Sequence, residues 1–515
     1  MRTLHSLSTI GRLAATLCLL ISFLGCAAPA APTLTSVVTA QGEPTALPAE
    51  PTAEQPEPTV APATGLASPS FAPIGTAAGD DLSQDGHSWS QADPILIDRY
   101  GHLIVPLQRY NDVDKRNLFV FSNDGGASWT DNTAAEPEGF IERGTATYDA
   151  ANDVIHMLWI GQSSAEGVFY RRYTPVRDAE HRIAGIERTP DISLPLDREE
   201  GDPIGFQHPL LLHVADEGLG TYGAILAIWG ARGYGEQPGN EIRASMCVMA
   251  ENPTACGSAA AWKAPVVLDT TSIGGQPLVA YSALLSNRTA DIAYPSALRK
   301  SAGTNAGDVY LFYHNGGTFG EGQWALRRMV WSAEAADWSA GLTEPRTIAP
   351  QQRAGSDAGY ALKQQLGSKP VEDPRGDRVY FAFASWKSDA EGDTWSFVAV
   401  DAAAGDLPSP IVDVYSAGGP HSYAPTGDIS FDAVSGRLIV SYITTGEQRA
   451  ELRLYEGLDP ADDPVTAFDA APADIPLLAS RARYGEPARL LVLLRDTTGT
   501  PEPPYRAWFG GLAWQ

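Results

Sequence analysis

The sequence is poor in basic residues and in catalytic signatures, and each shortage excludes a class of function. Its 515 residues include 36 Lys and Arg against 62 Asp and Glu, which gives a net charge of −26. Nucleic acids and anionic membrane surfaces require clustered positive charge, which this chain lacks. The nine histidines show no metal-ligand spacing, and no HExxH, GxSxG or glycine-rich phosphate loop occurs. We therefore expect no nucleic-acid partner, no metal and no cofactor.

Cysteine is also scarce, with four residues in the whole chain. Cys18 falls in an N-terminal apolar run, and Cys26 follows that run after Gly25. Cys247 and Cys256 stand nine residues apart around an Asn-Pro pair. Such a pair can close a hairpin disulfide in an oxidising compartment. A metal pair is the alternative, but no His or Cys lies nearby to complete it.

The first 25 residues have the pattern of a targeting segment. Arg2, His5 and Arg12 lead into the apolar run 13–24, which is too short for a standard membrane span. The run ends in FLGCAAP, which resembles a bacterial lipobox and implies that Cys26 is lipidated. An ordinary secretory signal is the alternative. We expect residues 1–25 to be a signal peptide and the mature chain to lie on the extracytoplasmic face of a bacterial cell envelope, touching the membrane only through its lipid.

Residues 26–79 differ in composition from the rest of the chain. They are rich in Ala, Pro and Thr, carry scattered Glu and contain no Lys or Arg. Such a segment has too little apolar surface to fold, so we expect a disordered linker.

Residues 80–515 repeat one pattern, in which a polar turn precedes a short apolar strand. Fifty Gly and 39 Pro supply many turns. Four-stranded units at intervals of roughly 50–85 residues are typical of a β-propeller, because each sheet buries both faces against its neighbours. A pair of β-sandwiches would need a central linker, and none is visible. The most evident strand of each unit begins near residues 101, 153, 223, 308, 378, 436 and 488.

We therefore predict an all-β fold with a single propeller of four-stranded blades over residues 80–515. The count of central strands is seven. The last unit, 476–515, shows only three strands, and its fourth is expected from the segment around Gly86–Ser90. If that unit instead completes the first blade, the count is six.

The stretch SNDGGASW has the chemistry of a fastened hairpin turn. Ser122 and Asp124 can accept hydrogen bonds from backbone N–H groups. Gly126 can adopt a positive φ, and Trp129 can lay its ring over the turn. This pattern resembles the Asp-box, or BNR repeat, of sialidase-like β-propellers. Two later segments resemble partial copies, SAEAADW at 332–338 and SDAEGDTW at 388–395.

The resemblance has consequences for both structure and activity. In that family the Asp-box lies between the third and fourth strands of a blade, away from the active site, so it implies a structural role for Asp124. Family sialidases use three arginines, a tyrosine nucleophile, its glutamate partner and an acid–base aspartate. The first arginine usually stands in an RIP-type motif, whereas this chain has Asp93-Pro94 there and no RIP or RLP anywhere.

A propeller ligand site is expected at the axial funnel, where the innermost strands begin. Acid, base or nucleophile candidates at those positions are Asp93, Glu142 and Tyr423, and ligand-binding candidates are Arg143, His208, Lys363, His421 and Arg483. For each of these residues the alternative is a structural role, either as a solvated loop residue or in a hydrogen bond at the end of a strand. Neighbouring tyrosines and amides, including Gln207, Tyr294 and Gln365, suit a neutral or mixed glycan.

Three functions remain open from the sequence. We predict foremost a propeller that binds glycans or similar ligands in its funnel without clear sialidase chemistry. The alternatives are a sialidase-like glycoside hydrolase and a protein-interaction scaffold at the cell surface. The oligomeric state cannot be derived from the sequence.

Overall fold

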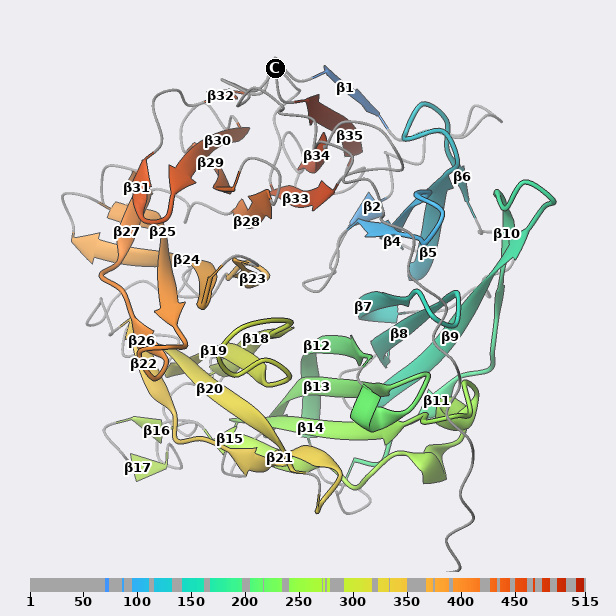
Figure 1. The fold of residues 1–515 in the computed structure, drawn as a ribbon, viewed down its shortest axis with the longest axis horizontal. Helices are drawn as coiled ribbons and strands as arrows, with labels where there is room; N and C mark the ends of the chain where they lie inside the picture. The colour runs from blue at the N-terminus through green and yellow to red at the C-terminus, as the bar shows by residue number, and fades with distance from the viewer. Residues whose placement is uncertain are drawn as a thin grey trace, which may run out of the picture. The chain divides into compact units, whose positions relative to one another are not determined.

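The architecture comes from a computed structural model of the chain, drawn in Figure 1. The structure describes residues 70–73, 86–87, 95–110, 115–131, 141–161, 167–196, 204–215, 217–233, 240–270, 272–273, 276–277, 291–316, 323–332, 334–349, 367–373, 376–388, 392–416, 427–432, 436–444, 450–460, 466–467, 475–481, 489–496 and 506–513. In the described residues, no helix is long and apolar enough to cross a membrane.

The described strands are antiparallel and belong almost entirely to four- and five-stranded sheets set in a ring (Figure 1). Six sheets use strands that are consecutive in the chain, and we number them 1 to 6 in chain order. A closing sheet, sheet 7, joins strands from both ends of the described chain. The all-β propeller with four-stranded blades that the sequence predicts is confirmed.

The first three sheets cover residues 86–270. Sheet 1 contains β2 (Gly86–His87), β3 (Leu96–Ile97), β4 (Leu103–Tyr110), β5 (Lys115–Ser122) and β6 (Thr130–Asp131). Sheet 2 contains β7 (Ile141–Asp149), β8 (Val154–Gly161), β9 (Val168–Arg177), β10 (Ile183–Arg188) and β11 (Ile192–Ser193). Sheet 3 contains β12 (Ile204–Val214), β13 (Ala224–Gly233), β14 (Asn240–Val248) and β15 (Val266–Thr270). Three short 3-10 helices accompany it: η3 (Glu217–Leu219), η4 (Ala255–Gly257) and η5 (Ala259–Ala261).

The remaining sheets follow the same order. The small pair β16 (Ser272–Ile273) and β17 (Gln276–Pro277) precedes sheet 4, which contains β18 (Asp291–Arg299), β19 (Val309–Gly316), β20 (Gln323–Ser332), β21 (Asp337–Leu342) and β22 (Arg346–Ala349). Sheet 5 contains β23 (Val371–Glu372), β24 (Arg378–Ser388), β25 (Gly392–Asp401), β26 (Leu407–Pro408) and β27 (Val412–Ser416). Sheet 6 contains β28 (Gly427–Asp432), β29 (Arg437–Ile443), β30 (Ala450–Glu456), β31 (Asp459–Pro460) and β32 (Thr466–Ala467). Sheet 7 contains β33 (Ile475–Arg481), β34 (Arg489–Asp496), β35 (Arg506–Ala513) and β1 (Ser70–Pro73).

All seven central strands expected from the sequence are observed, as β4, β8, β13, β19, β24, β29 and β34. Each is the second strand of its sheet. Their middle residues are mostly apolar, and where burial is described these residues pack between neighbouring sheets.

The hydrophobic core is divided into layers between consecutive sheets. Phe381 of sheet 5 is fully buried against sheet 4, where its ring stacks on Phe312 at 4.5 Å and meets Trp324 edge-on at 5.1 Å. Burial of one such ring contributes about 2–3 kcal/mol. Similar layers of buried side chains lie between sheets 1 and 2, 2 and 3, 3 and 4, and 5 and 6.

Ring closure uses a different segment from the one expected. β1, at Ser70–Pro73, pairs with β35 and supplies the fourth strand of sheet 7. The expected segment contributes β2, Gly86–His87, but β2 pairs with β4 in sheet 1. The expectation that an N-terminal segment completes the last sheet is therefore confirmed, but the segment expected to do so, Gly86–Ser90, was wrong. β1 lies ahead of residue 80, within the segment predicted as linker.

Candidate functional site at the starts of the innermost strands

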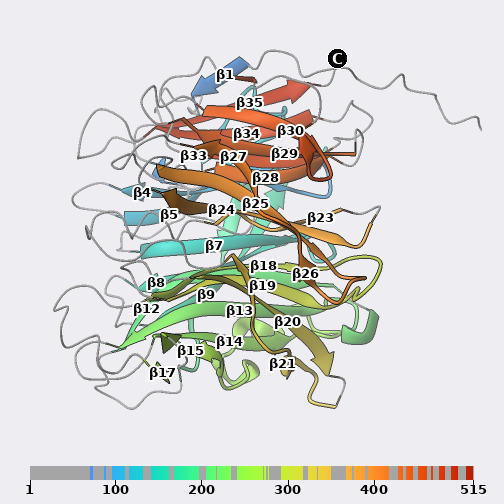
Figure 2. The same cartoon turned by 90° about the vertical axis from the view of Figure 1, so that its left-hand side faces the viewer.

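The strand register distinguishes two ends of the sheets. Leu103, which follows the first turn of sheet 1, pairs with Ser122 at the end of β5. The turns after the first and third strands therefore share one end, which we call the turn end. In sheets 1 to 6 the first strand is the innermost strand of the ring. These innermost strands begin at the opposite end of the sheets, which we call the strand-start end. Figure 2 shows the sheets from the side.

Three neighbouring innermost strands are irregular near the strand-start end. The pairing of β7 with β8 shifts between Ile141 and Arg143. That of β12 with β13 shifts between Gln207 and Leu210, and that of β18 with β19 shifts between Ala293 and Ser296. β12 lies beside both β7 and β18, so the three irregularities are on adjacent strands.

The sequence explains two of these irregularities. Pro209 and Pro295 stand inside the shifted segments of β12 and β18. Proline has no N–H to donate to the ladder, so regular pairing stops there. Bulges bend a strand and redirect its side chains, and they are frequent next to functional sites.

Three of the predicted site residues stand on these strands. Glu142 and Arg143 belong to β7, with Glu142 at its bulge, and His208 belongs to the irregular segment of β12. The structure thus brings these three backbone positions to one end of two adjacent strands. The other predicted site residues lie outside the described residues, namely Asp93, Lys363, His421, Tyr423, Arg483 and the expected lipidation site Cys26.

The turn that contains Asp124 lies at the turn end. The Ser128 backbone N–H donates to Asp124 Oδ1 at 2.9 Å, and the Ser122 hydroxyl donates to the same oxygen at 2.7 Å. The backbone N–H of Gly126, whose φ is +96°, donates to Ser122 Oγ at 2.7 Å. Burial opposes ionisation, but the bonds from Ser128 and Ser122 outweigh it and lower the pKa of Asp124. The carboxylate therefore fastens the turn.

The two partial copies of the turn motif differ in position. SAEAADW joins β20 to β21, the third and fourth strands of sheet 4, as SNDGGASW does in sheet 1. The segment from Ser388 to Trp395 instead joins β24 to β25, the second and third strands of sheet 5. The interpretation of this segment as a third copy of the turn motif was wrong, because its similar residues form a turn at the strand-start end of sheet 5.

A tryptophan recurs near the start of the fourth strand in three sheets. Trp129, Trp262 and Trp338 are each 4% exposed or less. Trp338 Nε1 donates to the carbonyl of Gly307 at 3.2 Å, and Trp262 Nε1 donates to the carbonyl of Cys256 at 3.2 Å. The position of Trp262 was not predicted from the sequence, because the Ser and Asp residues of the turn motif do not stand at the corresponding positions before it.

A buried polar cluster lies between sheets 2 and 3, toward the turn end. His156 and Asp149 are fully buried, and His156 Nε2 is 3.5 Å from Asp149 Oδ2. His213 of β12 approaches the same oxygen with its Nε2 at 3.5 Å. On the other side of the ring, His156 Nδ1 is 2.6 Å from the Tyr170 hydroxyl.

The electrostatics of this cluster follow from its burial. Burial disfavours the imidazolium form and lowers the pKa of His156 to about 4, although Asp149 acts in the opposite direction. Burial also opposes ionisation of Asp149, but His156 and His213 outweigh it and lower the pKa of that carboxyl. His156 is thus neutral and Asp149 ionised near pH 7. The cluster can order the seam between two sheets, but no part of His156 reaches solvent.

The cysteine pair predicted from the sequence forms a disulfide bond, Cys247–Cys256, with the Cα atoms 5.8 Å apart. Among the described residues, no group of three or more His, Cys, Asp or Glu side chains is placed to hold a metal ion.

Comparison with known proteins yields similar folds. No protein-family model matches the sequence. A search of curated proteins also found no match. Solved structures that resemble the chain include the polysaccharide lyase Uly1, with 9% identity, 82% of this chain and 90% of that chain covered, and a TM-score of 0.42. An alpha-L-arabinanase of Penicillium chrysogenum, complexed with arabinobiose, has 11% identity, 73% and 98% coverage, and a TM-score of 0.39.

A third example is the alpha-L-arabinofuranosidase Arb93A of Fusarium graminearum, with 8% identity, 86% and 97% coverage, and a TM-score of 0.37. By their descriptions, all three proteins act on glycans. At these identities and TM-scores, the likeness carries no argument about the activity of this chain.

Proposed function

We propose that the chain is a surface-anchored, extracytoplasmic lipoprotein whose propeller binds glycans at the strand-start end. The observation that carries this proposal is the set of irregularities on the adjacent strands β7, β12 and β18. Glu142, His208 and Tyr294 stand at these positions. A carboxylate, an imidazole and an aromatic ring are groups that hydrogen-bond sugar hydroxyls and pack on sugar faces.

The charge of the chain favours an uncharged or mixed glycan. A net charge of −26 repels acidic ligands at long range unless arginine is concentrated locally. The arginine motif expected of a sialidase is missing from the sequence. We therefore propose binding without sialidase chemistry.

The disulfide supports the proposed compartment. Cys247 and Cys256 are joined, and disulfides persist in oxidising environments such as the cell exterior. Together with the predicted signal peptide and Cys26, this favours an anchored protein outside the cytoplasm.

Binding can be tested on a glycan array with the full-length protein in detergent. Arabinobiose, which is bound in one of the similar structures, joins neutral oligosaccharides and sialosides on the panel. We expect neutral or mixed glycans to be retained, and His208→Ala and Glu142→Gln to weaken retention. His181→Ala is the control, because His181 is exposed in a turn at the turn end.

Each outcome has a stated meaning. Retention of sialosides alone, or of no glycan, contradicts the proposal. Hydrolysis of aryl-glycosides that Glu142→Gln abolishes while glycan retention persists would replace it with a glycoside hydrolase.

A further inference from the structure

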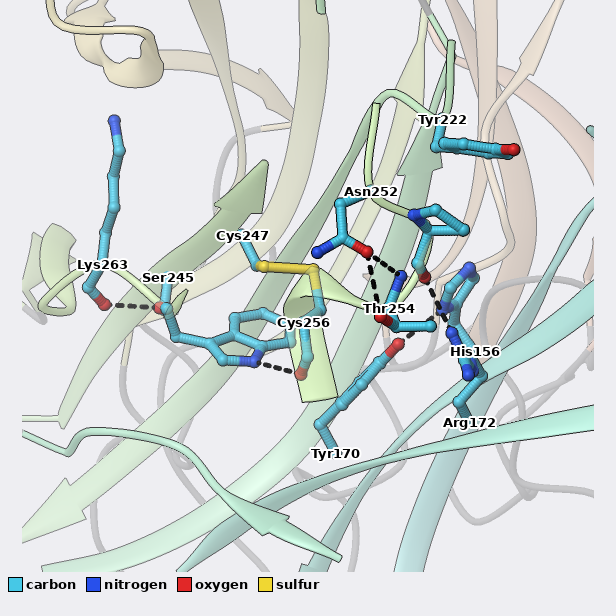
Figure 3. The surroundings of a disulfide bond; sticks show 12 residues. His156, Tyr170, Arg172, Tyr222, Ser245, Cys247, Asn252, Thr254, Cys256 and Lys263 are labelled. Atoms are coloured by element: carbon cyan, nitrogen blue, oxygen red, sulfur yellow. Dashed lines mark hydrogen bonds between the residues drawn. A yellow bond between two sulfur atoms is a disulfide. The ribbon is translucent and has the colours of Figure 1, made fainter. Parts of the chain in front are cut away.

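We propose that the loop between β14 and β15, which the Cys247–Cys256 disulfide joins to β14, is a redox-controlled element that holds sheet 3 against sheet 2 and keeps the buried polar cluster of that seam away from solvent. The loop follows β14 and continues through η4 and η5 to β15. Figure 3 shows its surroundings. This inference is independent of the proposed glycan site, which lies at the strand-start end.

The disulfide fixes the loop to its own sheet. Cys247 belongs to β14, and Cys256 belongs to η4, the short helix at the far side of the loop. Both cysteines are buried in the layer between sheets 2 and 3. The carbonyl of Cys256 accepts the hydrogen bond from Trp262 Nε1. The bond thus sets both the path of the loop and the position of the Trp262 ring.

The fixed loop then contacts sheet 2 through Pro253, whose carbonyl also accepts a longer bond from the Asn152 side chain at 3.5 Å, and through Trp262. Arg172 of β9 donates from its guanidinium to the carbonyl of Pro253 at 2.7 Å. The ring of Trp262 meets the Tyr170 ring edge-on, with centroids 5.0 Å apart. Pro253 and Trp262 lie on either side of Cys256 in the chain, so the disulfide positions both contacts.

These contacts lie directly against the polar cluster. Tyr170 bonds His156 through its hydroxyl, and Arg172 is paired with His156 across β8 and β9. The titratable and charged groups that surround His156 come from three strands: Asp149 of β7, Tyr170 and Arg172 of β9, and His213 of β12. If the loop moves away from Tyr170 and Arg172, the side chains that shield His156 from solvent therefore lose their packing partners.

Reduction supplies a defined chemical release. A thiolate of a dithiol donor attacks one sulfur of Cys247–Cys256, and a mixed disulfide forms as the other sulfur leaves as a thiolate. The second donor thiol then closes the donor's own disulfide. The chain gains two electrons and two protons and ends with two thiols, while the dithiol is oxidised. Because both cysteines are buried, the attack follows a local opening of the loop.

The test measures hydrogen–deuterium exchange at the imidazole C2 position of individual histidines by mass spectrometry. The full-length protein is compared in its oxidised form and after treatment with dithiothreitol. We expect reduction to accelerate exchange at His156 by about tenfold or more, since local opening controls access to a buried group. Exposed His181 and the more distant His102, in the seam between sheets 1 and 2, should exchange at unchanged rates.

A second variant separates the contact from the disulfide. Arg172→Met removes the bond to Pro253 while the disulfide stays intact, and we expect faster exchange at His156 in the oxidised protein. Arg182→Met, at an exposed position between β9 and β10, is the matched control and should change nothing. Unchanged His156 exchange after reduction overturns the proposal. Acceleration by the same factor at His156 and His102 also overturns it, because access to His156 would then follow global unfolding and not a local opening of this seam.

Discussion

Acidification should destabilise the protein through His156, and the structure sets the size of the effect. His156 is fully buried, and burial lowers its pKa from the ordinary value of 6.5 to about 4. We assign the tautomer protonated at Nε2, in which Nδ1 accepts the hydrogen bond from Tyr170 and Nε2–H faces Asp149. The folded protein therefore keeps His156 neutral in a range where the unfolded chain takes up a proton.

The sign of the pH dependence follows directly. Between pH 6.5 and 4 the unfolded state binds more protons than the folded state, so the free energy of unfolding falls as pH falls. One pKa unit corresponds to about 1.4 kcal/mol, so the loss reaches about 2 kcal/mol at pH 5 and about 3 kcal/mol well below pH 4. The lowered pKa of Asp149 adds a further loss in the same direction as that carboxyl becomes protonated.

Urea unfolding at pH 7.5 and pH 5 measures this difference. His156→Gln keeps a polar side chain that does not titrate, and its pH dependence should be smaller than that of the wild type by about 2 kcal/mol. His181→Gln, at an exposed position, should behave as the wild type does. Equal pH dependence in the wild type and in His156→Gln would refute the reasoning.

Three further predictions concern stability. Replacing both Cys247 and Cys256 by Ser should lower the free energy of unfolding by about 2.6 kcal/mol, the loop-entropy value for a separation of nine residues; an unchanged urea midpoint would contradict this. Asp124→Ala should cost about 1–2 kcal/mol through its lost turn bonds and leave glycan binding intact, and lost binding would show that Asp124 is functional. Lys300→Met should cost about 3–5 kcal/mol in urea unfolding, because Lys300 is fully buried between two carboxylates of sheet 5. Lys263→Met, at a more exposed ion pair, should cost less than about 1 kcal/mol, and equal losses for the two lysines would contradict the argument.

Local patterns made the propeller predictable. Each of the seven central strands contains a largely apolar run bounded by turn residues, and all seven are second strands of sheets. The bonds around Asp124 are likewise made within eight residues, so their donors and acceptors can be read in the sequence.

The rest of the fold depends on distant segments. β1 was not predicted because SFAP is four residues long and lies in a Pro- and Ala-rich stretch, and only pairing with β35 makes it a strand. The cluster at His156 was missed for a similar reason. His156 stands inside an apolar run. Its partners on β7 and β9 meet it through strand pairing within sheet 2, and His213 on β12 approaches only when sheets 2 and 3 pack.

The candidate site was predicted in part. Proline next to a polar or aromatic residue, as in His208-Pro209, is visible in the sequence, but the adjacency of β7 and β12 is a property of the ring. Asp93 and Tyr423 lie outside the described residues, so their roles stay predictions.

The central claim is that the strand-start end of the innermost strands binds glycans. Isothermal titration calorimetry of the full-length protein with the best neutral glycan from the array, on wild type, His208→Ala and His181→Ala, tests it most directly. We predict saturable binding that His208→Ala weakens by about tenfold or more, the scale of one lost polar contact of 1.4 kcal/mol, while His181→Ala binds as the wild type does. Equal affinity in all three proteins, or no heat of binding in the wild type, would contradict the account.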